Sequence, residues 1–280
     1  IVKTTEKLIV GYLKRFFKSC SHIFVPTIGM TDYLTESCGY AKDNVSVLPT
    51  GISNNSFLVD ADNCKSIRQT YGAEECPMFI SVSRIAKEKN ISFLLHSLKR
   101  FKDSYQKPFR MLFVGDGPNK KELELLAAKL GLSEEVVFTG KIENKKLKDY
   151  YGASDAFIFA SKSETQGIVL LEAFAAKTPV IGVEASGVSD LVSDGRNGFL
   201  VPEDEDIFAE KIKILITDSL LCDSLKKGAF QSASTFDESN IAKEALYQYN
   251  NVVAQNYSIL SNYEEGQKSG EQVSYLNSRG

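Results

Sequence analysis

Short apolar segments rich in β-branched residues alternate with segments of helical period through the middle of the chain. The segments of helical period are residues 91–101, 120–130, 145–151 and 167–176, and the apolar ones are 78–83, 110–115, 135–140, 156–161, 179–183 and 198–201. Strands that alternate with helices pair in parallel and are covered on both faces. The pattern therefore predicts an α/β fold with a doubly wound, Rossmann-like parallel sheet.

The two ends of the chain add helical segments to this sheet. Residues 1–18 have the apolar spacing of a helix, and the short strand-like and helical pieces that follow do not complete a sheet of their own. Helical segments also follow the last strand, whereas the final residues are polar and without period. The predicted divisions are residues 1–50, the sheet domain at 51–235, a C-terminal helix at 236–257 and a disordered tail at 258–280.

Charge and hydropathy exclude two classes of protein. The 280 residues include 33 Lys and Arg against 36 Asp and Glu, a formal net charge of −3. Proteins that bind nucleic acid in general carry a basic excess, so no nucleic-acid partner is expected. The most apolar stretch, residues 165–183, contains Glu172 and Lys177, so no membrane-spanning helix is predicted.

Cysteine and histidine are too few and too dispersed for a metal site or a disulfide framework. The five cysteines form no CxxC pair, and the sequence contains two histidines. Free thiols favour a reducing compartment, so a cytoplasmic location is predicted. The chain begins at Ile1 without a signal-peptide pattern, and we expect it to be a piece of a longer protein.

Two acidic residues follow the predicted strand at 156–161. Glu164 lies in the loop, and Glu172 lies eight residues later in a helix that is apolar nearly all round. Helical side chains tilt toward the helix N-terminus, so Glu172 is expected to lean toward that loop. Gly167 permits close approach of a ligand, and the free N–H groups at the helix start favour an anion. A phosphate-linked polyhydroxy ligand fits this pattern; equally, Glu164 can cap the helix and Glu172 can satisfy a buried polar group.

Two basic residues follow the strand at 78–83. Arg84 and Lys89 lie at its carboxyl end, where open α/β sheets bind their ligands. The planar guanidinium of Arg84, which can bind two oxygens at once, and the compact ammonium of Lys89 together suit a diphosphate. The alternative is a solvated, charged loop, which the neighbouring Lys87 and Glu88 also favour.

Glycines follow the next two strands. Gly115 and Gly117 form a tight turn, which lacks the third glycine of the dinucleotide-binding fingerprint. Turn chemistry explains these glycines as well as a ligand does. Main-chain groups near Gly140 and Ile142 can meet a flat base, although the pattern alone is a weak signal for it.

Taken together and in this order, these segments resemble the retaining glycosyltransferases of family 4, which have the two-domain GT-B fold. The matching segments read VSRIAKEKN, FVGDGP, VFTG, ETQGIVLLEAFAAKTPVI and GVSDLVSDGRNGFLV. The ETQG variant and the opening FVPTIGMTDYLTESCGY with VSVLPTGI are most similar to the branch that makes glucosyldiacylglycerols. One departure is Ser53, where family members commonly have Asp.

The resemblance implies a role for each candidate residue. Arg84 and Lys89 would hold the donor diphosphate and offset charge on the leaving group, and Glu164 would order the sugar hydroxyls; these are the implied catalytic residues. Glu172 would bind the ribose hydroxyls. The rest of the implied donor site comprises Lys141 and Ile142 around the base, the main chain of Gln166, Gly167 and Ile168 at the sugar and phosphate, and Gly115 and Gly117.

The resemblance also implies an organisation and substrates. Residues 1–50 would be the end of an N-terminal acceptor domain, and residues 236–257 the helix that crosses back to it. The implied donor is UDP-glucose and the implied acceptor diacylglycerol, with a saccharide or cell-envelope polysaccharide acceptor, or a non-catalytic nucleotide-binding module, as alternatives. No metal cofactor is expected, because cations and a helix end supply the positive charge. We expect the missing half to contact the inner face of the membrane, and this piece to bind the donor without transferring sugar.

Overall fold

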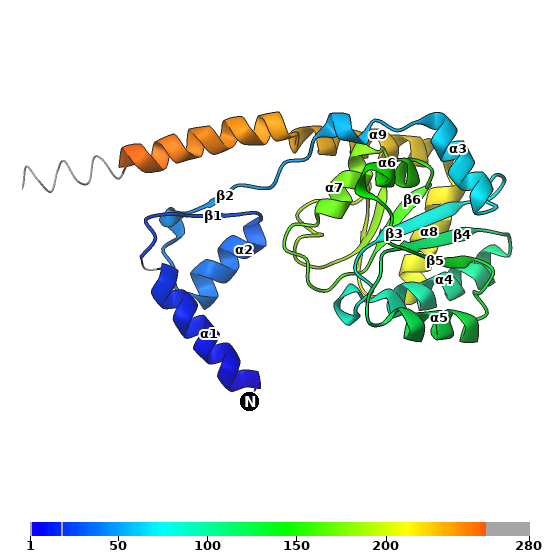
Figure 1. The fold of residues 1–280 in the computed structure, drawn as a ribbon, viewed down its shortest axis with the longest axis horizontal. Coiled ribbons are helices and arrows are strands. Elements are labelled where there is room, and N and C mark those ends of the chain that lie inside the picture. The colour runs from blue at the N-terminus through cyan, green and yellow to red at the C-terminus, as the bar shows by residue number, and fades with distance from the viewer. Residues whose placement is uncertain (1, 18, 256–280) are drawn as a thin grey trace, which may run out of the picture. The chain divides into compact units, whose positions relative to one another are not determined.

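The computed structural model describes residues 2–17 and 19–255, and the chain divides into two compact units. One unit comprises the described residues of Ile1–Leu48 and Ile241–Gly280, and the other comprises Pro49–Asn240. The chain passes from the first unit to the second after Leu48 and returns after Asn240 (Figure 1). The tail predicted at 258–280 lies outside the described residues.

The second unit is built on a sheet of six parallel strands. The strands are β3 (Met78–Val82), β4 (Arg110–Val114), β5 (Val136–Gly140), β6 (Ala156–Phe159), β7 (Val180–Val183) and β8 (Gly198–Val201). Their spatial order is β5-β4-β3-β6-β7-β8, the order of a Rossmann fold. The doubly wound parallel sheet predicted from the sequence is therefore confirmed.

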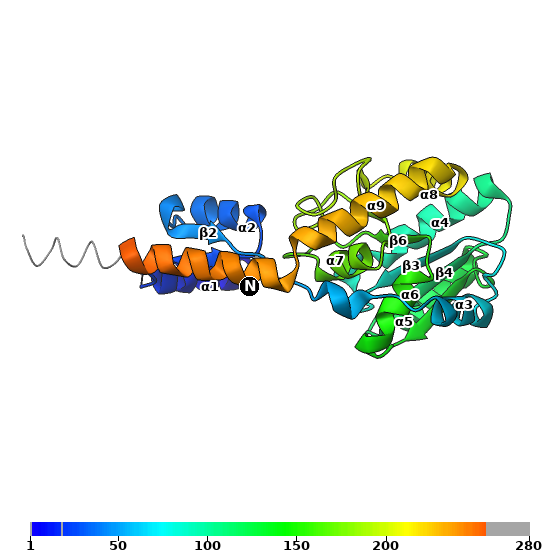
Figure 2. The same ribbon diagram turned by 90° about the horizontal axis from the view of Figure 1, so that it is seen from above.

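Helices cover both faces of this sheet. One face carries α4 (Ile91–Tyr105), α5 (Lys120–Lys129) and α8 (Glu205–Thr217), and the other carries α3 (Ala61–Thr70), α6 (Asn144–Gly152), α7 (Ile168–Ala175) and α9 (Ser219–Thr235). Figure 1 shows α6 and α7 above the strands and α4 and α5 below them, and Figure 2 shows α4 and α8 side by side. No helix in the described part of the chain is long and apolar enough to cross a bilayer.

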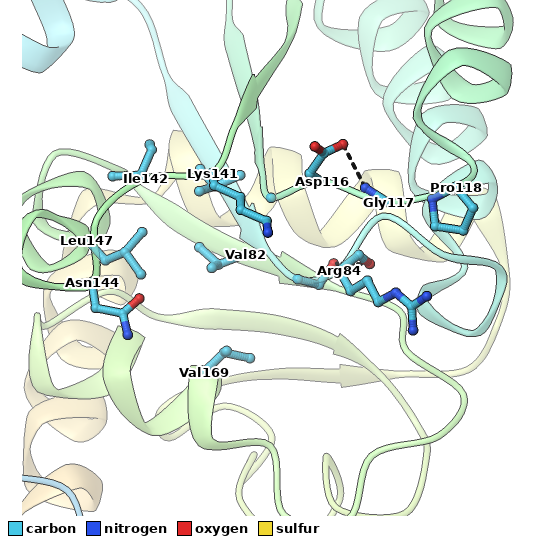
Figure 3. Close-up of a pocket in the computed structure, with 13 residues that line it drawn as sticks. Val82, Arg84, Asp116, Gly117, Pro118, Lys141, Ile142, Asn144, Leu147 and Val169 are labelled. Atoms are coloured by element: carbon cyan, nitrogen blue, oxygen red, sulfur yellow. Dashed lines mark hydrogen bonds between the residues drawn. The ribbon is translucent and has the colours of Figure 1, made fainter.

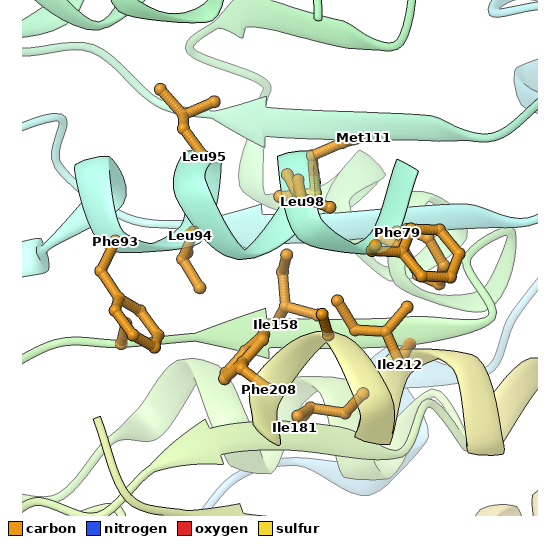
Figure 4. Close-up of a cluster of buried hydrophobic side chains, with 14 of the residues drawn as sticks. Phe79, Phe93, Leu94, Leu95, Leu98, Met111, Ile158, Ile181, Phe208 and Ile212 are labelled. Carbon is orange, nitrogen blue, oxygen red and sulfur yellow. The ribbon is translucent and has the colours of Figure 1, made fainter. Parts of the chain in front are cut away.

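The alternation of side chains along each strand produces two separate cores. In β3, Phe79 packs into the cluster beneath α4 and α8, whereas Met78 and Ile80 point to the cluster beneath α6 and α7. All three side chains are fully buried, and burial of each contributes about 1.5–3 kcal/mol. Figure 4 shows Phe79 and Phe208 among the side chains that fill the first cluster. Because both faces are covered, the strands are predominantly apolar, which is why the sequence pattern revealed all six.

The sequence pattern did not predict α3. This helix, ADNCKSIRQT, is mostly polar, and its few apolar residues, none of them fully buried, are too few to mark a helix in the sequence. Its start is fixed by Asp60, whose carboxylate accepts hydrogen bonds from the main-chain N–H groups of Asp62 and Asn63 at 2.9 and 3.0 Å. That N-cap is the signal in the sequence that marks the helix.

The first unit holds the N-terminal pieces and the last described helix. Its elements are α1 (Val2–Phe17), β1 (Ile23–Val25), α2 (Ile28–Asp32) and β2 (Val45–Val47), with β1 and β2 paired in parallel. Single helical turns lie at Tyr33–Ser37 and Lys42–Asn44 in this unit, and at Asn54–Phe57 and Lys87–Lys89 in the second unit. Residues 238–255 are helical, and in this unit Gln248 donates to the carbonyl of Val47 at 3.1 Å. The ring of Tyr249 lies 4.7 Å from that of Phe24.

Gly228 in α9 offers a test of this packing. An added Cβ would lie 1.9 Å from the main-chain oxygen of Arg196, so Gly228→Ala must push α9 away from that loop. We expect the free energy of unfolding to fall by about 1–3 kcal/mol, measured by urea denaturation, although alanine is the better helix former by about 1 kcal/mol.

Gly11→Ala in α1 is the matched control, since nothing lies within 4 Å of its added Cβ. This substitution should leave the midpoint of urea unfolding unchanged or raise it. An unaltered midpoint in Gly228→Ala would show that α9 does not pack as described.

Candidate functional site

The strand order of the sheet reverses between β3 and β6. From β3 the strands β4 and β5 follow one another toward one edge of the sheet. The next strand, β6, pairs with β3 on its other side, and β7 and β8 continue toward the opposite edge. The loops after β3 and β6 therefore leave the sheet in opposite directions, and their carboxyl ends form the crevice where such sheets bind ligands. A cavity of about 760 Å³ lies at this edge, and the residues that line it come mainly from the loops after β3, β4 and β5 (Figure 3).

Main-chain hydrogen bonds hold the loops of β3 and β4 together at the floor of this cavity. Ile85 N–H donates to the carbonyl of Asp116 at 3.0 Å. A Cβ on Gly115 would lie 1.9 Å from the oxygen of Ser83, and one on Gly117 would lie 2.2 Å from that of Ile85. The packing of the two loops thus requires both glycines, and both also line the cavity.

Two cations line the cavity, one from each side. Arg84 follows β3 and Lys141 follows β5, and Figure 3 shows both side chains among those that line the cavity. Within residues 2–17 and 19–255, neither has an ion-pair partner. Their charge is therefore available to an anionic ligand. Sequence reasoning assigned Lys141 through its main chain and did not foresee its side chain here.

Lys89 and Glu164 form an ion pair across the reversal point. The Lys89 Nζ lies 3.0 Å from Glu164 Oε2, and the two side chains are 17% and 18% exposed. The amine also lies 5.9 Å from the ring centroid of Phe159 at the end of β6. Glu164 therefore does not cap α7, which was the alternative reading of the sequence; the helix begins after Gly167 with no side-chain cap.

Glu172 projects from the second turn of α7 and hydrogen-bonds with Tyr151 of α6. The Tyr151 hydroxyl donates to Glu172 Oε2 at 2.8 Å. Burial raises the pKa of the Glu172 carboxyl, and the tyrosine hydrogen bond offsets part of that rise. Burial and the nearby Glu172 carboxylate raise the pKa of Tyr151 well above its ordinary value. Glu172 thus has a buried polar partner, as the second reading of the sequence proposed, and is not among the residues that line the cavity.

The remaining residues expected from the sequence lie around the start of α7 and after β5. Gly167 has a φ of 72°, which other residues rarely adopt, and precedes Ile168, the first residue of the helix. Gln166 is buried, and its side chain is bonded to the main chain of Thr50. Ile142 lines the cavity.

Sequence reasoning missed the apolar wall of the cavity. Val82, Val114, Leu147 and Val169 line it, together with the polar side chain of Asn144 (Figure 3). Val82 and Val114 are the last residues of β3 and β4, so their position at a strand's carboxyl end was the available signal. Together with Ile142, these side chains make one part of the cavity suitable for a flat, apolar ring.

A pH series tests the burial of Glu172. Its pKa lies above the ordinary 4.5, so the folded protein binds this proton more tightly than the unfolded chain does. Stability should therefore fall as the pH rises from about 4.5 through the raised pKa. In Glu172→Gln this loss is absent, so the difference in unfolding free energy should increasingly favour the variant as the pH rises from about 4.5 through the raised pKa.

Urea denaturation at several pH values measures this difference. Glu210→Gln, at an exposed position of α8, is the matched control and should change stability little at any pH. A difference for Glu172→Gln that does not vary with pH would contradict the account of this carboxyl.

Comparison with known proteins agrees with this architecture. The chain is 33% identical over 76% of its length to the sulfoquinovosyl transferase SQD2 of Arabidopsis thaliana, covering 41% of that protein. It is 32% identical over 74% of its length to the alpha-monoglucosyldiacylglycerol synthase of Streptococcus pneumoniae, covering 48% of it. The chain thus spans less than half the length of these two relatives.

Solved structures of GT-B glycosyltransferases share the fold. Anabaena HepE in complex with UDP and glucose superposes with a TM-score of 0.78 at 24% identity, over 89% of this chain and 67% of that one. Residues 64–232 match the family described as Glycosyl transferases group 1, and this match covers more than half of the chain. The chain belongs to the group 1 glycosyl transferases.

Proposed function

We propose that the cavity at the carboxyl edge of the sheet binds a nucleotide sugar, and that this chain is the C-terminal, donor-binding part of a family 4 retaining glycosyltransferase. The observation that carries the proposal is the Lys89–Glu164 ion pair, which joins the loops after β3 and β6 where the strand order reverses. Arg84, from the same β3 loop as Lys89, lines the cavity, whereas the two residues of the pair are not among its lining residues. Together the pair and Arg84 bring cations suited to a diphosphate and a carboxylate suited to sugar hydroxyls to one crevice.

The lining of the cavity supports a division of this ligand into parts. The apolar wall at Ile142 and Val169 suits the base, and the unpaired cations Arg84 and Lys141 suit the diphosphate. The free N–H groups at the start of α7 would bind phosphate and sugar oxygens, where Gly167 leaves no side chain in the way. Glu172 is held by Tyr151 and is not among the lining residues; it would accept hydrogen bonds from ribose hydroxyls that reach past the lining.

In the proposed reaction, the bond between the sugar C1 and the diphosphate oxygen breaks, and its electron pair leaves with the diphosphate. The acceptor hydroxyl then bonds to C1 from the same face, and its proton passes to the departing phosphate. Arg84 and Lys89 lie where the negative charge grows, so they stabilise the transition state more than the bound donor. Lys89 would share its charge between Glu164 and the leaving group.

For the substrates, we propose UDP-glucose as donor and diacylglycerol as acceptor. The name of the Streptococcus pneumoniae relative specifies a monoglucosyldiacylglycerol product, and the Anabaena structure contains UDP and glucose. The name of SQD2 specifies a different sugar, so the sugar is the part of the donor that varies among these relatives. The ETQG loop at residues 164–167 is the segment on which we base glucose and diacylglycerol.

Calorimetric titration of this chain with UDP and with uridine tests the proposal. We expect UDP to bind, and Arg84→Ala to weaken UDP binding by about 10- to 100-fold, the range for hydrogen bonds to charged groups. Uridine lacks the diphosphate, so its affinity should be the same in the variant and the wild type.

Lys87→Ala is the matched control, because Lys87 is an exposed cation in the same loop and does not line the cavity. It should leave both affinities unchanged. Absence of UDP binding, or an equal loss for UDP and uridine in Arg84→Ala, would refute the diphosphate assignment.

A further inference from the structure

The loop after β6 makes a second set of contacts, away from the Lys89–Glu164 pair. The side chain of Gln166 is 5% exposed and bonds to both main-chain groups of Thr50. Thr50 N–H donates to Gln166 Oε1 at 2.9 Å, and Gln166 Nε2 donates to the Thr50 carbonyl, also at 2.9 Å. The carboxamide therefore pairs with Thr50 as a neighbouring strand would, through one donor and one acceptor.

Thr50 lies beside the point where the chain enters the second unit, which begins at Pro49. Two residues later, Ile52 N–H donates to the carbonyl of Phe236, and Glu238 N–H donates to the carbonyl of Ile52, each at 2.9 Å. Glu238 in turn precedes the point where the chain leaves this unit, after Asn240. The entering and the leaving segment are therefore hydrogen-bonded to each other, and Gln166 is bonded to the entering one.

The opposite end of the same loop is fixed at the proposed donor site. Glu164, two residues before Gln166, pairs with Lys89 at 3.0 Å. Lys162 N–H donates to the carbonyl of Glu88 at 2.9 Å. Gly187 packs so closely against this loop that a Cβ there would lie 2.6 Å from the main-chain oxygen of Glu164. The loop is thus held at Glu164 by the site and at Gln166 by the connecting segment.

We propose that Gln166 is a positioning residue. Its side chain joins the loop after β6 to the segment that enters the second unit at Thr50, and through the hydrogen bonds of Ile52 to the segment that leaves it, so that the loop and both segments move as one body. The role of the loop at the donor rests on the proposed function, whereas the connection through Gln166 is a property of this chain. A glutamine suits the position because glutamate cannot donate to the Thr50 carbonyl when ionised, and methionine offers neither hydrogen bond.

Amide hydrogen exchange of the whole chain, resolved by residue with NMR, tests whether the Gln166 side chain holds Thr50. In Gln166→Met, exchange at Thr50 should be at least about tenfold faster than in the wild type, because its amide loses its acceptor. Exchange at Ile52 and Glu238 should rise with it. Gln69→Met, at an exposed position of α3, is the matched control and should exchange as the wild type does. An unchanged rate at Thr50 in Gln166→Met would overturn the proposal.

Addition of UDP tests whether nucleotide binding at the cavity affects the connecting segments through Gln166. In the wild type, UDP should slow exchange at Thr50, Ile52 and Glu238, whereas in Gln166→Met it should slow exchange near the cavity and leave these three amides unaffected. If UDP slows exchange at these three amides equally in both proteins, Gln166 does not couple the cavity to the connecting segments. If UDP slows exchange nowhere in the wild type, the proposed function fails. The exchange rates of Gln166→Met and the wild type without nucleotide still test whether Gln166 holds Thr50.

Gln166→Glu distinguishes the loss of the paired hydrogen bonds with Thr50 from a general effect of the substitution on folding. Its carboxylate can accept from Thr50 N–H but gains a proton to donate only at lower pH. Protection at Thr50, corrected for intrinsic exchange, should therefore recover as the pH falls from about 7 to about 5, because burial against a carbonyl favours the protonated acid. Protection that does not depend on pH would contradict the paired geometry.

Discussion

The ion pair between Lys89 and Glu164 joins the two loops that diverge where the strand order of the sheet reverses. Its side chains are mostly buried, so loss of either partner would leave the other charge without compensation. The pair therefore holds a cation and an acid side by side at the crevice, together with the main-chain bond between Lys162 and Glu88. Since Lys89 is already paired, the charge open to a ligand in the cavity comes chiefly from Arg84 and Lys141.

Close main-chain packing sets the shape of the crevice around that pair. The loop of Gly115 and Gly117 presses against the loop of Arg84, and Gly187 presses against the loop of Glu164. Such contacts leave little freedom for the segments that carry the charged side chains. The donor site that we propose is thus built on a rigid edge of the sheet, and the second unit contains all the residues that form it.

The sequence predicted the sheet because most of its strands are buried on both faces and appear as predominantly apolar runs. It missed α3, which is mostly polar and has no fully buried residue. It placed Glu164 and Arg84 at the correct edge, since that follows from strand direction alone. It gave no partner for Glu172 or Gln166, because Tyr151 and Thr50 are distant in sequence and meet them only through tertiary packing.

A crystal structure of this chain with bound UDP tests the central claim most directly. The account predicts the diphosphate within hydrogen-bonding distance of Arg84 and of the main chain at the start of α7, with the uracil ring against Ile142 and Val169. Nucleotide bound elsewhere on the chain, with this cavity empty or filled by side chains, would contradict it.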